Sequence, residues 1–470
     1  MITFDFDRRG KTSLCDWIYS SIKNQIAGGS LREGEKLPSK RSLAQNLGVS
    51  VITVQNAYAQ LIDDGFICSV EKKGFFVSAG GTPETQNVSS ISLESLNESE
   101  TEEKQQEFFA DFTSNSTSFE KFPFALWART LRQVLNSGDE KLLQKNTAKG
   151  VFELRLAISR HLFEFRGINV LPEQIVIGSG TESLYTMLVQ LLGRERVFAV
   201  ENPGYHKASA VFELNGAETV PVSLDSSGIK MEELEKSGAD VLHVSPNHNF
   251  PTGIVTLSQR RREILEWAQE KEGRWIIEDD YDSEFRFNGK PLPPLQSIDS
   301  AQKVIYINTF TKTLAPSLRI SYMVLPQSLL ADFEKKLGFF ACPVSSFEQF
   351  TLARFISEGH YEKHIVRMKN FYRNLRNSLV TAIKKSDMEG KFKIYEKEAG
   401  LHFLLSVDSP QKIEVLEEKL KANGINLRRL DSFYYGRTPD ENEKTFVVNY
   451  SGIKKERIEK SVELLRDALK

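Results

Sequence analysis

The chain has 470 residues, of which 40% are hydrophobic, so it can bury large cores and we expect two or three domains. Its 61 basic and 63 acidic residues give a formal net charge of −2, which excludes a strongly cationic chain and leaves only local patches for nucleic-acid contacts. The three cysteines lie far apart without a CxxC pair, which argues against a disulfide framework or a zinc site.

The beginning of the chain, MITFDFDRRG, contains no apolar signal-peptide core. No run of about 18 apolar residues, which a membrane-spanning helix needs, occurs in the sequence. Isolated cysteines also favour a reducing compartment. We therefore expect a cytoplasmic protein without membrane contact.

Three helices and a hairpin are predicted before residue 79. Apolar residues at positions 14, 18, 22 and 26 indicate a first helix ending at Gly28 and Gly29. PSKRSLAQNLG starts a second helix at Pro38 and Ser39, and VSVITVQNAYAQLIDDGF indicates a third after Gly48. ICSVEKKGFFV follows as a β-hairpin, so the order is that of a winged helix-turn-helix.

The segment LPSKRSLAQNLGVSVITVQNAYAQLIDDGFICSVEKKGFFV resembles the GntR-type DNA-binding domain along its whole length. The resemblance implies a DNA-binding domain over residues 10–78 that contacts double-stranded promoter DNA. The candidate phosphate contacts are Lys40, Arg41, Lys72 and Lys73, and the candidate major-groove contacts are Ser50, Thr53 and Gln55. Val51 stands where the GntR pattern usually has arginine, and a valine can touch only a thymine methyl group.

Residues 79–109 are rich in Gly, Pro, Ser, Thr and Glu and predict a flexible, acidic linker. Seven glutamates and one lysine lie between residues 81 and 108. The linker separates the DNA-binding domain from a body that we place at residues 110–470.

The body alternates short apolar runs with amphipathic stretches, which predicts an α/β fold with a large, mostly parallel sheet. Its strands are expected in EQIVIGSG, RVFAVENPGY, VLHVSPNHNF, RWIIEDDYD, KVIYINTFTK and RISYMVLP. Polar residues follow these strands, where ligands bind in such sheets. From about residue 327 the pattern becomes helical and then returns to short strands, which predicts a small α+β lobe.

Lys312, in NTFTKTLAPSLR, raises the question of whether its amine is a nucleophile. A lysine that forms a Schiff base with pyridoxal 5′-phosphate needs a carboxylate beside the pyridine nitrogen, a donor to the phenolic oxygen, a phosphate cradle and an aromatic cover. Asp279 and Tyr281, two residues apart at a strand end and facing the same way, are the candidates for the first two needs. The turn at Gly178 before a predicted helix suits a phosphate, and Tyr205 suits the cover.

From GSGT through NFPTG, DDYD and TFTKTLAPSLR the body resembles fold-type I aminotransferases, and together with the GntR-type head the chain resembles the MocR family of bacterial regulators. That family has GABA-responsive and PLP-responsive members. The resemblance implies an internal aldimine at Lys312, Asp279 on the pyridine nitrogen, Tyr281 on the phenolic oxygen and Tyr205 stacked on the ring. It places Ser179, Gly180, Thr181, Thr309, Thr311 and Arg319 on the phosphate, and the amide of Asn249 is a further candidate for the phenolic oxygen.

Three functions are compatible with these residues. In the first, which the MocR resemblance favours, the chain is a regulator and not an enzyme: an amino compound forms an external aldimine in exchange for Lys312 and the body repositions the DNA-binding heads of a homodimer, with at most residual half-transamination. In the second, PLP itself is the effector and the chain controls vitamin B6 supply. In the third, the body is an active aminotransferase with an accessory head.

Basic residues near the cofactor are the candidates for gripping an effector carboxylate, because a guanidinium matches a carboxylate bidentately. Lys207 lies two residues after Tyr205, and GINLRRLDSFYYGRTP adds three arginines without indicating which of them faces the pocket: Arg428, Arg429 and Arg437. Ala148 stands in NTAKGVFELR where related chains often have proline. The sequence does not identify the effector.

Overall fold

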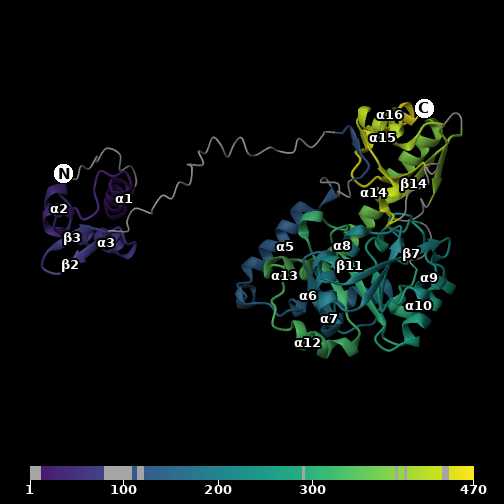
Figure 1. Ribbon diagram of the computed structural model, residues 1–470, viewed down its shortest axis with the longest axis horizontal. Helices are drawn as coiled ribbons and strands as arrows, with labels where there is room; N and C mark the ends of the chain where they lie inside the picture. The colour runs from purple at the N-terminus through teal and green to yellow at the C-terminus, as the bar shows by residue number, and fades with distance from the viewer. Residues whose placement is uncertain are drawn as a thin grey trace. The chain divides into compact units, whose positions relative to one another are not determined.

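The computed structural model describes residues 12–78, 108–113, 121–287, 292–386, 390–395, 400–436 and 444–469. The chain forms two compact units, residues 1–105 and 106–470 (Figure 1). Most of the predicted acidic linker, residues 79–107, lies outside the described residues. Among the described helices, none is long and apolar enough to span a bilayer.

The first unit is a winged helix-turn-helix, as predicted. It contains α1 (Leu14–Ala27), α2 (Lys40–Leu47) and α3 (Val51–Asp63), with a sheet of order β1-β3-β2 formed by Lys36–Leu37, Gly74–Val77 and Ile67–Val70. Each helix begins at a serine cap whose hydroxyl accepts a backbone N–H: Ser13, Ser39 and Ser50. Gly48 ends α2 in the left-handed conformation, which makes the turn into α3.

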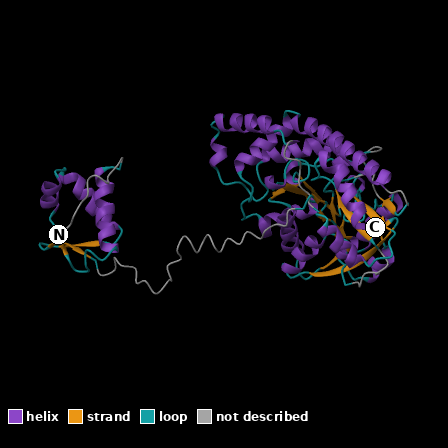
Figure 2. Ribbon diagram, turned by 90° about the horizontal axis from the view of Figure 1, so that it is seen from above, coloured by secondary structure: helices purple, strands orange, loops and turns teal. Residues whose placement is uncertain are grey.

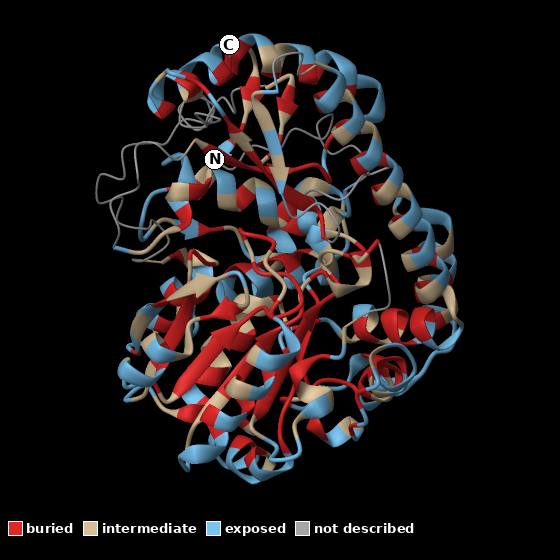
Figure 3. Ribbon diagram, turned by 90° about the vertical axis from the view of Figure 1, so that its right-hand side faces the viewer, coloured by how far each residue is buried: buried red, intermediate tan, exposed pale blue. Residues whose placement is uncertain are grey.

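The second unit is built on an eight-stranded sheet of order β5-β12-β11-β10-β9-β6-β7-β8. In chain order the strands are Ile175–Gly178 (β5), Val197–Asn202 (β6), Glu218–Asp225 (β7), Gly228–Ile229 (β8), Val241–Val244 (β9), Trp275–Asp279 (β10), Val304–Thr309 (β11) and Ser321–Val324 (β12). The ladders from β7 to β11 are parallel, whereas β12 and β8 pair antiparallel with their neighbours. The central strands are buried on both faces, which explains their continuous apolar sequences (Figure 3).

Helices cover both faces of this sheet (Figure 2). Ile277 packs with α7 (Thr181–Leu192), α8 (His206–Leu214) and α12 (Leu330–Leu337) in one core. Its neighbour Ile276 faces the opposite core with α10 (Ser258–Glu270), and α6 (Phe152–Arg166) with α13 (Ser346–Ser357) extends that second layer beside α5 (Phe124–Asn136). Successive strand residues therefore face opposite helix layers.

The small lobe is a four-stranded antiparallel sheet of order β13-β14-β17-β16. Its elements are α14 (His360–Ser386), β13 (Phe392–Tyr395), β14 (His402–Val407), α15 (Ile413–Ala422), β15 (Ile425–Asn426), β16 (Arg428–Arg429), β17 (Thr445–Asn449) and α16 (Ile458–Leu469). The short strand β4 (Ala110–Asp111) pairs with β15, so the start of the second unit belongs to this lobe.

The lobe begins later than residue 327, where the sequence placed it. Phe333 and Leu337 of α12 belong to the core beneath the large sheet, and Leu352 of α13 packs in the opposite layer. Among the helices after residue 327, α14 is the first to join the core of the small lobe, from Met368 onward. The sequence indicated helices correctly there, but helical periodicity does not say which sheet a helix covers.

Candidate cofactor pocket and DNA-binding surface

The polar residues predicted for the cofactor gather at one edge of the large sheet. In the β10–β11 ladder Asp279 lies opposite Ile307, which places it beside the end of β11. Thr309, the last residue of β11, pairs with Ser321 of β12, and Ser321 pairs in turn with Gly178 at the end of β5. Three strand ends thus meet, as expected for a ligand site of an α/β sheet.

A pocket of about 230 Å³ opens at this edge. Nine of the predicted site residues line it: Thr181, Tyr205, Lys207, Asp279, Tyr281, Thr309, Thr311, Lys312 and Arg319. Seven residues that the sequence analysis did not select also line it: Glu182, Ser245, Phe250, Asp282, Pro316, Leu401 and His402. Leu401 and His402 come from the small lobe, so both lobes form the pocket.

Lys312 lies in the turn after β11 with its amine inside the pocket. Burial lowers the pKa of Lys312 to about 8, and the negative charges of Asp282 and Asp279 act in the opposite direction. A substantial fraction of the amine is therefore neutral near physiological pH. A neutral, desolvated amine is what nucleophilic attack on a carbonyl requires.

Asp279 at the end of β10 has one satisfied and one unsatisfied carboxylate oxygen. Tyr185 donates a hydrogen bond to Oδ2 at 2.6 Å, whereas Oδ1 is buried without a partner among the described residues. Burial raises the pKa of Asp279 to about 7, opposed by the hydrogen bond from Tyr185. A cationic N–H placed at Oδ1 would compensate the buried charge, so the carboxylate fits a protonated pyridine nitrogen.

Tyr281 is linked to a histidine and a second carboxylate. Its hydroxyl lies 3.2 Å from Nδ1 of His248, and that nitrogen lies 2.8 Å from Oδ2 of Asp282. The ring centroids of His402 and His248 lie 4.5 Å apart. Asp282 and His402 were not selected from the sequence, although Asp282 directly follows Tyr281 in DDYD.

The predicted phosphate ligands surround the N-terminus of α7. Nη2 of Arg319 lies 2.6 Å from Oε2 of Glu182, and Nζ of Lys207 lies 3.8 Å from Oε1 of the same carboxylate. Gly180, with a φ of 89°, approaches the guanidinium of Arg319 so closely that a Cβ would clash with it. The guanidinium of Arg319 can therefore approach the backbone here only because residue 180 is glycine. The carboxylate of Glu182 is thus paired with both Arg319 and Lys207. Glu182 was not selected from the sequence.

The hydroxyl groups of the predicted phosphate ligands Thr309 and Thr311 lie close together. Oγ1 of Thr309 lies 2.9 Å from Oγ1 of Thr311 and accepts a hydrogen bond from Ser321 at 2.7 Å. Ser179 and Gly180 form the turn before α7 but do not line the pocket. Asn249 is also buried outside the lining: its Oδ1 accepts from Thr252, and its amide nitrogen has no partner of good geometry among the described residues.

The candidate effector residues separate into three groups. Lys207 lines both the cofactor pocket and an adjoining hollow of about 210 Å³, whose lining includes Arg428. Arg429 is paired with Asp431 and lies 3.3 Å from Glu414, so its guanidinium is already neutralised. Arg437 lies outside the described residues. Of the described members of the predicted set, Lys207 and Arg428 line the hollow beside the cofactor pocket, and Lys207 lies 3.8 Å from Glu182 there.

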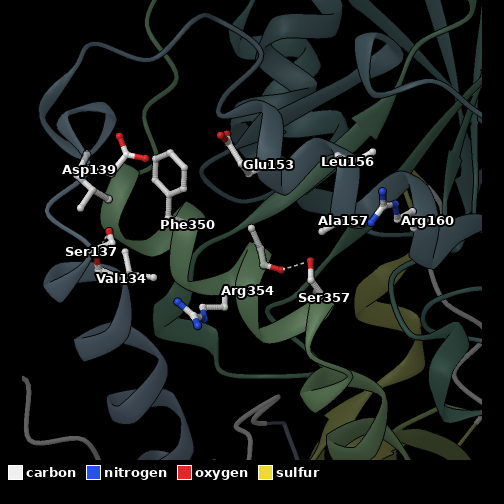
Figure 4. A pocket seen from close by; sticks show the side chains of 12 residues that line it. Val134, Ser137, Asp139, Glu153, Leu156, Ala157, Arg160, Phe350, Arg354 and Ser357 are labelled. Atoms are coloured by element: carbon white, nitrogen blue, oxygen red, sulfur yellow. Dashed lines mark hydrogen bonds between the residues drawn. The ribbon is translucent and has the colours of Figure 1, made fainter.

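A larger hollow of about 330 Å³ lies between α5, α6 and α13, and its lining differs in chemistry (Figure 4). Arg354 pairs with Glu358 at 2.7 Å, Glu153 pairs with Lys141 at 3.0 Å, and Ser357 donates to a backbone carbonyl at 2.8 Å. The charges of Arg354 and Glu153 are therefore already compensated, and no lysine lines this hollow. Volume alone does not select the functional site.

In the winged helix-turn-helix, the residues predicted to contact phosphates differ in their exposure and in their contacts with the rest of the domain. Arg41, Lys72 and Lys73 are exposed, whereas Nζ of Lys40 lies 5.2 Å from the ring centroid of Phe75. Among the predicted base contacts, Gln55 is exposed, but Ser50 caps α3 and its hydroxyl lies 2.8 Å from that of Thr53. Ser50 and Thr53 are thus engaged in starting the helix.

Comparison with known proteins covers both units. Residues 14–77 match the bacterial regulatory proteins of the gntR family, and residues 109–465 match aminotransferase class I and II. The chain is 34% identical to the uncharacterized HTH-type transcriptional regulator YdeL of Bacillus subtilis over 96% of each chain. It is 29% identical to the probable rhizopine catabolism regulatory protein MocR of Rhizobium meliloti, over 98% of this chain and 95% of the relative.

Among solved structures, the kynurenine aminotransferase of Pyrococcus horikoshii, determined with PMP, is similar to this chain with a TM-score of 0.67 and 24% identity. The alignment covers 80% of this chain and 93% of that one. At this identity the likeness establishes the fold of the second unit, which is that of fold-type I aminotransferases, as predicted.

Proposed function

The chain belongs to the MocR-type family of bacterial regulators, in which a gntR-family DNA-binding domain precedes an aminotransferase class I and II domain, and we propose that it binds promoter DNA and responds to an amino compound at Lys312. The relatives to which it is similar over nearly their whole length are named as regulators. An aminotransferase alone has no use for a winged helix-turn-helix.

The observation that carries the proposal is a buried amine and a buried, half-satisfied carboxylate that line the same pocket. The amine of Lys312 has a pKa of about 8, and Oδ1 of Asp279 is buried without a partner among the described residues. Pyridoxal 5′-phosphate, when bound, supplies an aldehyde that condenses with primary amines and a pyridine ring that withdraws electrons. Lys312 would hold it covalently, Asp279 would pair with its ring nitrogen, and Tyr281 would donate to its phenolic oxygen.

The remaining contacts follow from the same placement. The phosphate would be held by Arg319, Thr309, Thr311 and the turn at Ser179, Gly180 and Thr181, and Tyr205 would cover the ring. Asn249, whose side chain lies outside the pocket lining beside Glu201, stays a candidate for the phenolic oxygen. An effector amine would take the place of the Lys312 amine, an exchange that needs neither water nor an oxidant. Lys207 and Arg428 would bind an anionic end of that effector.

A homodimer is part of this proposal, because fold-type I bodies build their sites at dimer interfaces. The stacked pair Phe339 and Phe340, whose ring centroids lie 4.2 Å apart, supports it. Both rings are exposed in the single chain and would be buried by a second copy. A dimer would present two DNA-binding heads to two half-sites.

A PLP-sensing role is the second candidate, and Glu182 favours it. Because Glu182 pairs with Arg319 and Lys207, phosphate binding must displace a carboxylate and so changes the pocket even without an amine. Sensing requires that the two states of the body differ in free energy of DNA binding.

One experiment separates the candidates. Purified protein reconstituted with pyridoxal 5′-phosphate should absorb visible light, and Lys312→Ala should not. DNA affinity is then measured for the protein without cofactor, with cofactor, and with cofactor and a panel of amines. A change on adding an amine supports the proposed effector, whereas a change on adding cofactor alone supports PLP sensing. Sustained turnover with an amino donor and a keto acid would instead support an aminotransferase, and a colourless protein that cannot be reconstituted would refute the cofactor assignment.

A further inference from the structure

The outward face of α3 begins with two exposed apolar side chains. Val51 is 42% exposed and Ile52 is 70% exposed, and the next outward residues, Gln55 and Asn56, are exposed as well. Gln55 and Asn56 make no side-chain hydrogen bond within the part of the chain that the structure describes. We call Val51, Ile52, Gln55 and Asn56 the outward stripe.

The rest of α3 fixes which way this stripe faces. Val54, Ala57, Tyr58 and Leu61 are fully buried in the core of the winged helix-turn-helix. Tyr58 also donates a hydrogen bond to the backbone carbonyl of Pro38 at 3.0 Å, which ties α3 to the start of α2. The helix therefore cannot rotate about its axis without exposing its core residues, and the outward stripe is a fixed surface.

The composition of the stripe is unusual for a helix that reads DNA. The sequence of α3, VITVQNAYAQLID, contains no lysine or arginine. In the major groove, arginine and lysine are the side chains that pair with guanine, whereas glutamine and asparagine pair with adenine and apolar groups contact the C5 methyl of thymine. The stripe thus offers partners for both bases of an A·T pair and none of the usual partners for guanine.

Positive charge is placed beside the stripe and not on it. Arg41 on α2 and Lys72 and Lys73 between β2 and β3 are exposed. Such residues attract phosphates regardless of sequence. Affinity and base selection are therefore assigned to different residues, and a change in the stripe should alter the sequence preference more than the general attraction to DNA.

We infer that α3 recognises A·T-containing half-sites, in which Val51 and Ile52 contact thymine methyl groups and Gln55 or Asn56 pairs with adenine. This inference rests on the proposed function, because it requires that α3 enters the major groove of DNA. It adds the class of base sequence that the regulator selects.

Thymine methyl groups can be removed without changing base pairing, which gives a direct test. Duplexes that bind the full-length protein are first enriched from a random library, and the enriched sequence is resynthesised with dU in place of dT at single half-site positions. For wild-type protein, we expect at least one dU position to weaken binding about fourfold, the effect of losing one buried methyl group.

The same duplexes are then measured with Ile52→Ala and Val51→Ala. The variant that lacks the contacting side chain should bind the dT and dU duplexes equally, because no side chain remains to touch the methyl. Ile62→Ala is the matched control: Ile62 is 36% exposed near the other end of α3, and this variant should keep the full dU effect. A dU effect caused by DNA shape would persist in all three variants and would overturn the assignment of the contact.

Two further results would contradict the inference. Enrichment of half-sites dominated by G·C pairs, or equal binding of dT and dU duplexes by wild type, would overturn it while leaving a DNA-binding regulator intact. If the protein bound no duplex even at low salt, the proposed function and this inference would fail together.

Discussion

Tyr185 donates a hydrogen bond of 2.6 Å to Oδ2 of Asp279, while Oδ1 of the same carboxylate has no partner among the described residues. The strand end thus holds a carboxylate that is oriented on one side and available on the other. His243 lies beneath this pair, with Nε2 3.2 Å from the Tyr185 hydroxyl. Burial lowers the pKa of His243 to about 4, so the ring stays neutral and leaves the charge of Asp279 uncompensated.

Asp279→Asn should stabilise the protein without cofactor at neutral pH. Since the pKa of Asp279 is raised to about 7 in the fold, the folded state holds its proton more tightly than the unfolded chain, and ionisation destabilises the fold as pH rises from about 4 to about 7. We expect the free energy of unfolding of Asp279→Asn, relative to wild type, to increase over that range and then level off. A gain of about 2–4 kcal/mol is the order of magnitude.

Urea denaturation at a series of pH values measures this difference. Buried Glu278 and Glu284, whose pKa values are each raised to about 7, are present in both proteins and cancel in the comparison. The pKa of Glu201 is raised partly by the charge of Asp279, so it should fall in the variant. The same variant should lose affinity for pyridoxal 5′-phosphate. A stability difference that does not depend on pH would show that Asp279 is not the buried acid described.

Glu182→Gln should strengthen binding of phosphate-bearing cofactor. The substitution releases Arg319 and Lys207 from a competing carboxylate, and the side chains of both cations are partly exposed, so we expect a gain in affinity of roughly threefold to tenfold at low salt. Fluorescence titration with pyridoxal 5′-phosphate measures it. Glu153→Gln, which breaks the exposed pair with Lys141, is the control and should leave the affinity unchanged. A loss of affinity in Glu182→Gln would mean that Glu182 supports the site.

The rate of cofactor capture should follow the neutral amine of Lys312. With a pKa of about 8, roughly a tenth of the amine is neutral at pH 7, so the second-order rate should rise between pH 7 and pH 9 and then level off. Asp282→Asn removes a negative charge that raises the pKa of Lys312, so its rate profile should shift to lower pH. Stopped-flow absorption gives both curves. Identical profiles for the two proteins would exclude the influence of Asp282 on the amine.

Several strand ends and helix boundaries were predictable because they depend on local patterns. Ser39 at the start of α2, the turn at Gly48 and the polar residues at the ends of β10 and β11 are visible in the sequence, whereas Ser50, assigned to DNA, caps α3. Contacts between distant segments were not. His402 is far in sequence from the pocket residues of the large sheet, and it lines the pocket because the small lobe folds against the end of that sheet. The pairing of Glu182 with Arg319 spans 137 positions, and no local pattern indicates it.

Arg41→Ala should weaken binding to all duplexes and lower their salt dependence. Each phosphate contact contributes about 0.9 to the slope of log affinity against log salt, so losing one contact in each head should reduce the slope by about one per head. Lys72→Ala and Lys73→Ala should act in the same way, since both residues are exposed in the turn between β2 and β3.

Lys40→Ala should behave differently from these three variants. Its ammonium lies 5.2 Å from the centroid of the Phe75 ring, so removing it also removes a contact between α2 and β3. We expect a lower melting temperature for Lys40→Ala and little change in that of Arg41→Ala. Melting curves and filter-binding titrations between 50 and about 200 mM salt, on the same preparations, separate the two effects. If Arg41→Ala kept the slope of the wild type, α2 would not contact phosphates through its exposed first turn, and the face of the winged helix-turn-helix assigned to DNA would be wrong.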